Sequence, residues 1–459
     1  MYILVLESST TSSKALLYNI ETGNKELKVR AYPKSVILGT AGTYDPEAIF
    51  NESIMLGREL CINKDISAVV LCCTWHSLLL CDSKATPQSP VYKWNYSGAS
   101  EVCGKLRMDE QFTKYYYNLT GCVLSTIYPF FKMLHLGKHD MIMDQGSFAT
   151  YRLTDEWVVS DVTASGSGMM DVRTKKYSPE LLEMLGIDEH NLGAVVPHDY
   201  ALKLSPSGAS LLGLSAGIPV YPAIADGALN QLGSDAMGEG VMTFSAGTSG
   251  ALRINSPVPL LSKDCSTWCY ASTDGWLAGA ATAGCCNLLD WFVSKFGVGY
   301  DVAEEGFRPK QSQLVFLPFL FGERCPGWRD YVRGGFFNMS SEHDTYDMYH
   351  AIQEGILFNL YQCYKKLTAL SGSEPRTIKI SGGILSSQRW LQMATDIFGT
   401  PMEASDFSHA SLVGGVTVCL KKISLNTDLQ NPRIVYPNKA LSSYYEERYG
   451  IFLNYYDKL

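Results

Sequence analysis

The sequence predicts an α/β protein built from two similar halves with a cleft between them. Each half opens with an apolar strand, a turn rich in Ser, Thr or Gly, and a second apolar strand, at residues 2–18 and again at residues 241–254. In both halves, short apolar runs then alternate with stretches of helical periodicity, which is typical of α/β architectures. A Met-Gly-Glu-Gly turn signal within residues 236–240 separates the halves. We therefore expect domains of residues 1–238 and 239–459.

The remaining elements follow from the spacing of apolar residues. Residues 47–60 are expected to form a helix, because their apolar side chains share one face and Asp45 with Pro46 resembles an N-cap followed by a first-turn proline. Similar periodicity predicts helices at residues 345–370 and 387–398. Short apolar runs predict strands at residues 68–72, 78–81, 220–225, 314–317 and 378–381.

The first turn carries groups that suit a phosphate. Thr10 and Thr11 lie at its centre and Lys14 at its end, and the amides and hydroxyls of such a turn converge on phosphate oxygens. Glu7, where the first strand ends, is a candidate ligand for Mg²⁺, since this ion prefers carboxylates, phosphate oxygens and water. The alternatives are an ordinary hairpin turn, a Glu7–Lys14 pair and a solvated surface lysine.

The second turn, formed by Gly247, Thr248 and Ser249, has the same character. Its small side chains let the backbone approach an anion closely. An ordinary hairpin turn would explain either turn alone. Two such turns at matching places favour a shared polyphosphate site.

Asp226 ends an apolar strand and is followed at once by Gly227. A carboxylate at such a strand end is well placed to accept a proton from an incoming hydroxyl. It is also a candidate metal ligand together with Glu7. The alternative is a helix N-cap before residues 227–232.

Glycines follow a strand of the second half as well. Gly382 and Gly383 come after this strand and precede Ser386, Ser387 and a helical stretch. Strand, glycine turn and helix N-terminus together offer backbone amides to a nucleotide. Plain turn chemistry is the alternative.

Aromatic and polar side chains of the first half suit a sugar. Trp75, His76, Trp94 and Tyr96 offer ring faces and polar tips, which match the apolar faces and hydroxyl edges of a sugar ring. Any one of them is alternatively a core residue with a satisfied polar atom.

Composition limits the partners. The formal net charge of −8, without a long basic run, argues against a nucleic-acid or anionic-membrane surface. No basic stretch with an apolar segment precedes the first strand, and the richest apolar window, residues 68–81, is too short to span a bilayer. Thirteen cysteines, including the adjacent pairs Cys72/Cys73 and Cys285/Cys286, favour free thiols. We therefore expect a cytoplasmic protein.

In this order and spacing, the motifs resemble those of the FGGY family of carbohydrate kinases over about residues 3–420. Thr10, Thr11 and Lys14 match the family's Asp-x-Gly-Thr-Thr-x-x-x-Lys phosphate motif. Residues 225–227 resemble its catalytic aspartate segment, residues 247–249 its Gly-Thr-Ser loop and residues 381–399 its adenosine-side motif. Further matches occur at Tyr128, Pro129, Lys132, Glu323, Arg324, Pro326, Trp328, Glu354 and Gly355. Within the family, gluconokinases and xylulokinases have the most similar pattern.

The resemblance implies two RNase H-like, actin-type ATPase domains that close over ATP, Mg²⁺ and a small sugar, sugar acid or polyol, gluconate-like or xylulose-like. Asp226 would take the proton of the acceptor hydroxyl while the two turns hold the phosphates. The expected partner is a small molecule, with neither nucleic acid nor a membrane, and a homodimer is the assembly considered. The alternative is a catalytically weak protein of the same fold that senses a sugar or a nucleotide.

Several departures from the family pattern motivate that alternative. Glu7 replaces the usual aspartate, Ser9 the usual glycine and Trp75 the usual methionine. The family's Trp-x-Asp-x-Arg substrate motif lacks its aspartate and arginine here, and its nucleotide loop contains cysteines; these segments read Trp94, Asn95, Tyr96, Ser97, Gly98 and Ala283, Gly284, Cys285, Cys286. Because sites built on hydrogen bonds discriminate steeply, losing that aspartate changes which sugar is accepted.

Overall fold

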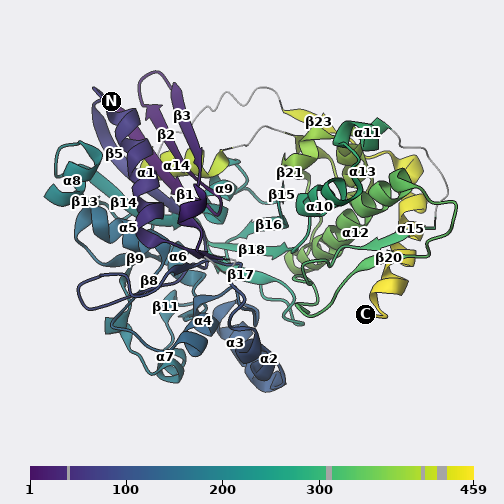
Figure 1. Ribbon diagram of the computed structural model, residues 1–459, viewed down its shortest axis with the longest axis horizontal. Helices are drawn as coiled ribbons and strands as arrows, with labels where there is room; N and C mark the ends of the chain where they lie inside the picture. The colour runs from purple at the N-terminus through teal and green to yellow at the C-terminus, as the bar shows by residue number, and fades with distance from the viewer. Residues whose placement is uncertain (39–41, 306–312, 405–408, 421–431) are drawn as a thin grey trace.

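Two α/β bodies, each built around one mixed sheet, form the protein in the computed structural model (Figure 1). The structure describes residues 1–38, 42–305, 313–404, 409–420 and 432–459. The N-terminal body contains a six-stranded sheet and the C-terminal body a seven-stranded sheet. The predicted two-domain α/β class is confirmed.

The six-stranded sheet brings the ends of three parallel strands to one edge. Both β1 and β14 run parallel to β5, so their carboxyl ends lie together. Antiparallel β1 and β2 form the first predicted hairpin. The strand order is β13 (Leu202–Lys203), β14 (Pro219–Ala225), β5 (Ile66–Cys73), β1 (Tyr2–Ser8), β2 (Ser12–Asn19) and β3 (Lys25–Ala31).

Helices α1 (Pro46–Cys61) and α14 (Ala410–Leu420) cover opposite faces of this sheet. Helix α1 begins as predicted, because the Asp45 carboxylate accepts the backbone N–H of Ala48 at 2.8 Å and proline follows in the first turn. It packs with Leu4 and Leu6 of β1, whereas α14 packs with the alternate residues Ile3 and Val5. Successive strand residues point to opposite faces, so the two helices sandwich β1.

Helix α14 comes from near the end of the chain and also lies against α9 (Asp226–Gly233). Glycines allow this close approach, because a Cβ on Gly414 would overlap the backbone of Leu229 and one on Gly233 would overlap the carbonyl oxygen of Ala410. The apolar patterns did not predict α14. The expected division at residue 238 therefore leaves a helix of the second half on the sheet of the first.

The seven-stranded sheet repeats the arrangement of strand ends. Strand β15 pairs antiparallel with β16, which confirms the second hairpin, and parallel with β21, so that Ala246 and Gly382 are register partners. The order is β17 (Trp268–Ala271), β18 (Trp276–Ala281), β16 (Gly250–Ser256), β15 (Val241–Ala246), β21 (Thr377–Gly382), β22 (Met402–Ala404) and β23 (Arg433–Val435).

A long buried helix, α12, forms the core of the C-terminal body with its neighbours (Figure 1). Its Asp344 N-cap is part of a capping box, and Glu354 in its middle pairs with Arg448 of the last helix at 2.5 Å. The elements here are α10 (Cys286–Phe296), α11 (Tyr300–Glu305), β19 (Val315–Leu317), β20 (Gly335–Phe337), α12 (Thr345–Ser371), η3 (Gly383–Ser386), α13 (Gln388–Phe398), η4 (Lys439–Leu441) and α15 (Ser442–Tyr456).

Smaller elements complete the N-terminal body. They are η1 (Lys34–Val36), β4 (Thr43–Tyr44), β6 (Leu79–Cys81), β7 (Val91–Tyr92), α2 (Ser100–Arg107), α3 (Glu110–Thr120), α4 (Pro129–Leu136), β8 (Met141–Met143), α5 (Gln145–Thr154), β9 (Val158–Ser160), α6 (Asp161–Ser165), β10 (Met170–Asp171), β11 (Lys176–Tyr177), α7 (Pro179–Leu185), η2 (Glu189–Asn191), β12 (Ala194–Val196) and α8 (Pro206–Leu212). Within the described ranges, no helix combines the length and apolar character needed to cross a bilayer. All thirteen cysteines are free thiols.

Candidate active site

Glu7 and Asp226 lie at the shared strand edge of the N-terminal sheet. Asp226 is the first residue of α9, its carboxylate accepts the backbone N–H of Gly227 at 2.8 Å, and Ala225 is the N-cap. The N-cap alternative for Asp226 is therefore wrong. Burial raises the pKa of Asp226 to about 6, and the nearby charge of Glu7 adds to this shift, while Arg253 opposes it.

Both carboxylate oxygens of Glu7 have partners. Lys14 donates to Oε1 at 2.8 Å, and Ser411 of α14 donates to Oε2 at 2.6 Å. Burial by itself lowers the pKa of Lys14, but the Glu7 carboxylate outweighs this effect and the net pKa is raised. The Glu7–Lys14 pair considered as an alternative is thus present in the structure, and the lysine is charged.

The side chains of Lys93 and Trp94 support the first turn, and the tip of this turn is exposed. The ammonium group of Lys93 donates to the carbonyl oxygen of Ser9 at 2.5 Å, and the indole N–H of Trp94 donates to the hydroxyl of Thr10 at 3.1 Å. Thr11 is exposed. Trp94 therefore connects the predicted sugar-binding residues with the predicted phosphate turn.

The second turn and the Gly382–Gly383 pair share one sheet edge. Gly247 and Thr248 are exposed and Ser249 is half-buried. Gly382 has φ +99°, and a Cβ there would overlap the carbonyl oxygen of Ala246. The close contact between the ends of β15 and β21 therefore requires glycine at this position.

Cys286, at the start of α10, lies next to Ala246 and Gly383. Its thiol donates to the Ala246 carbonyl oxygen at 3.3 Å, and a Cβ on Gly383 would lie 2.8 Å from its sulfur. Ser386 is exposed. Ser387 is buried and caps α13, because its hydroxyl accepts the N–H of Trp390 at 3.0 Å.

Aromatic rings join the two bodies beside Asp226. Trp75 and His76 pack with Tyr270 of β17, with ring centroids 5.0 and 5.3 Å apart respectively, and the hydroxyls of Tyr128 and Tyr270 are 2.7 Å apart. Trp75 is buried, and its indole N–H donates to the carbonyl oxygen of Val162 at 3.1 Å. Burial lowers the pKa of His76 to about 3, so its ring is neutral.

Tyr96 has its ring contact with another tyrosine of the N-terminal body. Its ring packs against Tyr92 at 4.7 Å, and a Cβ on Gly98 would overlap its hydroxyl. Trp94 is half-buried, and the guanidinium group of Arg324 lies 5.6 Å from its ring centroid.

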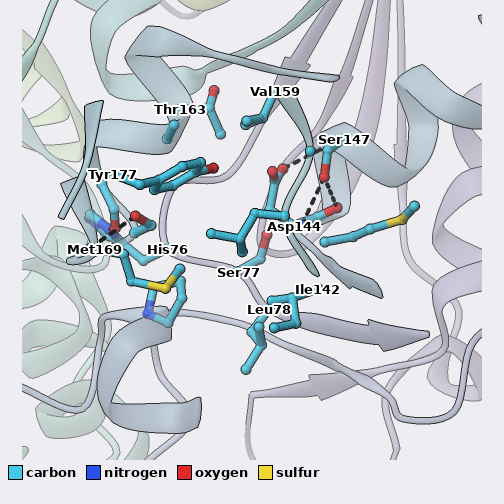
Figure 2. A pocket seen from close by; sticks show the side chains of 17 residues that line it. His76, Ser77, Leu78, Ile142, Asp144, Ser147, Val159, Thr163, Met169 and Tyr177 are labelled. Atoms are coloured by element: carbon cyan, nitrogen blue, oxygen red, sulfur yellow. Dashed lines mark hydrogen bonds between the residues drawn. The ribbon is translucent and has the colours of Figure 1, made fainter. Parts of the chain in front are cut away.

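His76 also lines a pocket of about 40 Å³ (Figure 2). Asp144 and Ser147 line it, and the Asp144 carboxylate accepts the backbone N–H groups of Gly146 and Ser147 at the start of α5, at 2.6 and 3.0 Å. A cavity of this size holds a few water molecules, since one water needs about 10–15 Å³ of such volume. It is too small for a sugar.

Four residues around Asp226 and the first turn were not singled out as site residues from the sequence: Lys93, Arg253, Arg324 and Ser411. Arg324 lies in the Gly-Glu-Arg-Cys-Pro-Gly-Trp segment that carried the family resemblance. Ser411 had no local signal, because only the packing of α14 on the N-terminal sheet brings it to Glu7.

Two mixed α/β bodies that meet beside a strand-end carboxylate, each with a hairpin turn rich in Ser, Thr or Gly, are typical of sugar kinases of the actin-like ATPase fold. Residues 2–233 match the N-terminal domain, and residues 242–422 the C-terminal domain, of the FGGY family of carbohydrate kinases. The chain belongs to this family and is an ATP-dependent carbohydrate kinase.

Relatives are similar over most of the chain. A gluconokinase of Bacillus subtilis is 26% identical over 441 residues, which cover 90% of this chain and 86% of that protein. A xylulose kinase of the same organism is 24% identical over 422 residues, with 87% and 84% covered. The crystal structure of a gluconate kinase from Lactobacillus acidophilus superposes with a TM-score of 0.91 at 23% identity and covers 100% of this chain and 98% of that one. These similarities give no support to the sensor alternative.

Proposed function

We propose that Asp226 takes the proton of a sugar hydroxyl as that hydroxyl attacks the terminal phosphate of ATP. The observation that carries this proposal is the position of its carboxylate, half-buried at a strand end, beside Glu7 and near Arg253 of the other body. A pKa of about 6 leaves the carboxylate mostly ionised at neutral pH and still able to accept a proton. Phosphoryl transfer depends mainly on positioning and charge stabilisation, so one well-placed base is sufficient.

We assign the phosphates of ATP to the two turns. The first contributes the hydroxyls of Thr10 and Thr11 and the charge of Lys14, and the second contributes the amides of Gly247 and Thr248 with the hydroxyl of Ser249. The exposure of Thr11, Gly247 and Thr248 supports this assignment, because these groups are accessible to a ligand.

We assign the nucleoside side to Gly382, Gly383, Ser386 and Ser387. The bare glycine backbone lies at the same edge as the second turn, which supports the assignment. Ser387 acts there through its helix cap, which orients the N-terminus of α13 toward this edge.

Glu7 and Asp226 are proposed to hold Mg²⁺, which when bound neutralises the charge that develops on the phosphates. Two nearby carboxylates fit this ion, because it completes its shell with phosphate oxygens and water. The described ranges contain no group of three or more potential metal-ligating side chains. Because the protein offers only these two carboxylates as proposed ligands, the site agrees with an Mg²⁺ ion that binds together with the nucleotide.

Trp75, His76, Trp94 and Tyr96 are proposed to line the sugar site. The neutral ring of His76 and the Trp75 ring face Tyr270 at the junction of the bodies, which supports a role in stacking on a sugar. Free thiols throughout and the use of ATP favour a cytoplasmic enzyme. A homodimer stays a prediction that sedimentation measurements would test.

The Asp226→Ala variant tests the proposed base. We expect kcat to fall by about 10²–10⁴-fold, the usual contribution of a general base, while ATP affinity measured by calorimetry changes little. The assay couples ADP release to gluconate, xylulose, ribulose and glycerol as acceptors. Asp274→Ala, at an exposed turn residue, is the control. Turnover by Asp226→Ala at the wild-type level would contradict the proposal.

A further inference from the structure

Two arginines converge on the proposed acceptor position. Arg253 of β16 donates to the hydroxyl of Ser245 at 3.1 Å, and its Nε lies 3.5 Å from where a Cβ on Gly227, the neighbour of Asp226, would stand. Arg324 lies over Trp94. Electrostatic effects on both guanidinium groups come from Tyr270, and Arg324 also acts on Arg253. The two guanidinium groups therefore lie near each other at the junction of the two bodies.

Neither guanidinium group has a close ion-pair partner, although the Asp226 carboxylate acts electrostatically on Arg253. In the described part of the chain, no carboxylate lies within 4.0 Å of either guanidinium group, and the buried Nε of Arg324 has no hydrogen-bond partner. Burial lowers the pKa of both arginines, yet arginine stays protonated in proteins. Both residues are half-buried by exposed surface, and a charge that is removed from water is costly unless an anion pairs with it.

Other partly or fully buried arginines of this chain show the contrast. Arg448 pairs with Glu354 at 2.5 Å, and Arg329 pairs with Glu323 at 2.6 Å. Among the described residues, by contrast, Arg253 and Arg324 have no carboxylate within 4.0 Å. An anionic ligand in this position would give both guanidinium groups a close partner.

The loop of residues 94–98 adds no negative charge to this site. Tyr96 stands where the family has an aspartate, and its ring packs against Tyr92. The chain therefore brings no carboxylate from this loop to bind neutral hydroxyls.

We infer that the acceptor is a sugar acid, whose carboxylate is bound by Arg253 and Arg324 while its hydroxyl faces Asp226. The planar guanidinium group binds a carboxylate through two parallel hydrogen bonds, so it also orients the substrate. The inference rests on the proposed function, because it names the acceptor of the same site. It makes the two arginines the determinants of specificity.

A matched pair of acceptors tests this inference. D-Gluconate and D-glucitol differ only at C1, which is a carboxylate in the first and a hydroxymethyl group in the second. We expect wild-type kcat/KM to be about 10²-fold or more higher for D-gluconate, since a buried unpaired group penalises the analogue that lacks its partner. Arg253→Met and Arg324→Met are expected to reduce the ratio of kcat/KM for D-gluconate to kcat/KM for D-glucitol to about tenfold or less, chiefly by raising KM for D-gluconate.

Two further variants control for folding and for charge. Arg253→Lys keeps the charge but loses the fork of donors, and we expect it to retain part of the preference. Arg333→Met removes an exposed guanidinium group that donates to the backbone carbonyl oxygens of Asp330 and Val332, and its ratio of kcat/KM values should equal that of the wild type. Thermal unfolding identifies any variant that has lost its structure.

The outcomes separate the inference from the proposed function. Turnover of neutral acceptors as efficient as that of D-gluconate overturns the inference and leaves the kinase proposal intact. An equal loss of kcat for both acceptors in the arginine variants also overturns it, because the arginines would then act on the phosphates. If no acceptor is phosphorylated, the proposed function fails, and calorimetry decides the inference: D-gluconate binding that Arg253→Met weakens supports it, and equal binding of both compounds overturns it.

Discussion

Lys93 is a fully buried lysine that supports the first turn. Its ammonium group donates to the carbonyl oxygen of Ser9 at 2.5 Å and lies 4.2 Å from the ring centroid of Tyr44 and 5.2 Å from that of Tyr32. Burial lowers its pKa to about 7, although the charge of Asp226 opposes the shift. The residue therefore combines a structural hydrogen bond with a titration close to neutral pH.

The lowered pKa predicts a pH dependence of stability. Between pH 7 and about 10.4, the usual lysine pKa, the unfolded chain binds more protons than the folded one, so stability rises with pH. The cost of burying the charge is fully present below pH 7 and disappears toward pH 10.4. We expect wild type to gain stability relative to Lys93→Met when urea unfolding is measured from pH 7 to pH 10.

The control for this titration is Lys105→Met, which removes a solvent-exposed lysine paired with Glu101. Its free energy of unfolding should follow the wild-type pH dependence. Parallel pH curves for Lys93→Met and wild type would show that Lys93 does not titrate in this range.

At the level of elements, helix α14 links the last part of the chain to the first strand. Its apolar face covers Ile3 and Val5, and the hydroxyl of Ser411 donates to Oε2 of Glu7. The Lys14 ion pair holds the other oxygen of this carboxylate. Helix α14 therefore fixes the orientation of the proposed metal ligand from outside the turn itself.

Ser411→Ala should release one side of Glu7. Loss of a hydrogen bond to a buried charged group costs about 1.5–3 kcal/mol, so we expect a lower free energy of unfolding and weaker activation when Mg²⁺ is titrated in the kinase assay. Thr417→Ala removes a hydroxyl of the same helix that donates to the carbonyl oxygen of Val413, and it should change neither the stability nor the Mg²⁺ dependence. Unchanged Mg²⁺ dependence in Ser411→Ala would separate α14 from the metal site.

At the level of the whole molecule, strand β17 joins the two bodies through buried polar contacts. The backbone N–H of Cys269 donates to the carbonyl oxygen of Gly121 at 2.9 Å, and the N–H of Ala271 donates to the hydroxyl of Ser165 at 3.0 Å. The hydroxyls of Tyr128 and Tyr270 meet at 2.7 Å beside His76. Trp75 and His76, which are proposed to line the sugar site, therefore also form part of the junction of the two bodies.

A double-mutant cycle on Tyr128 and Tyr270 measures this junction. Each change to Phe leaves the other hydroxyl buried without its partner, at a cost of about 1–3 kcal/mol. The double variant should be destabilised by less than the sum, with a coupling of about 0.5–3 kcal/mol in urea unfolding. Tyr128→Phe combined with Tyr200→Phe, at an exposed tyrosine, should be additive. Additivity in the Tyr128/Tyr270 cycle would rule out the coupling.

The elements and the order of the chemical groups were predictable because their signals are local. Apolar periodicity and the Asp45 cap located α1, and the Ser, Thr and Gly turns located both hairpins. Parallel pairing to β5 was not visible locally, yet it brings Glu7 and Asp226 to one edge. The roles proposed for these two residues stay predictions.

By itself, the sequence determined the two α/β halves, the hairpins with their exposed tips and the candidate Asp226, because turn chemistry and strand spacing act over a few residues. Tertiary structure alone decided that Ser411 holds Glu7, that Lys93 supports the first turn, that Arg253 approaches Asp226 and that Arg324 lies over Trp94. These contacts join residues far apart in the chain. Their electrostatic consequences depend on burial and on neighbours, which only the packed molecule defines.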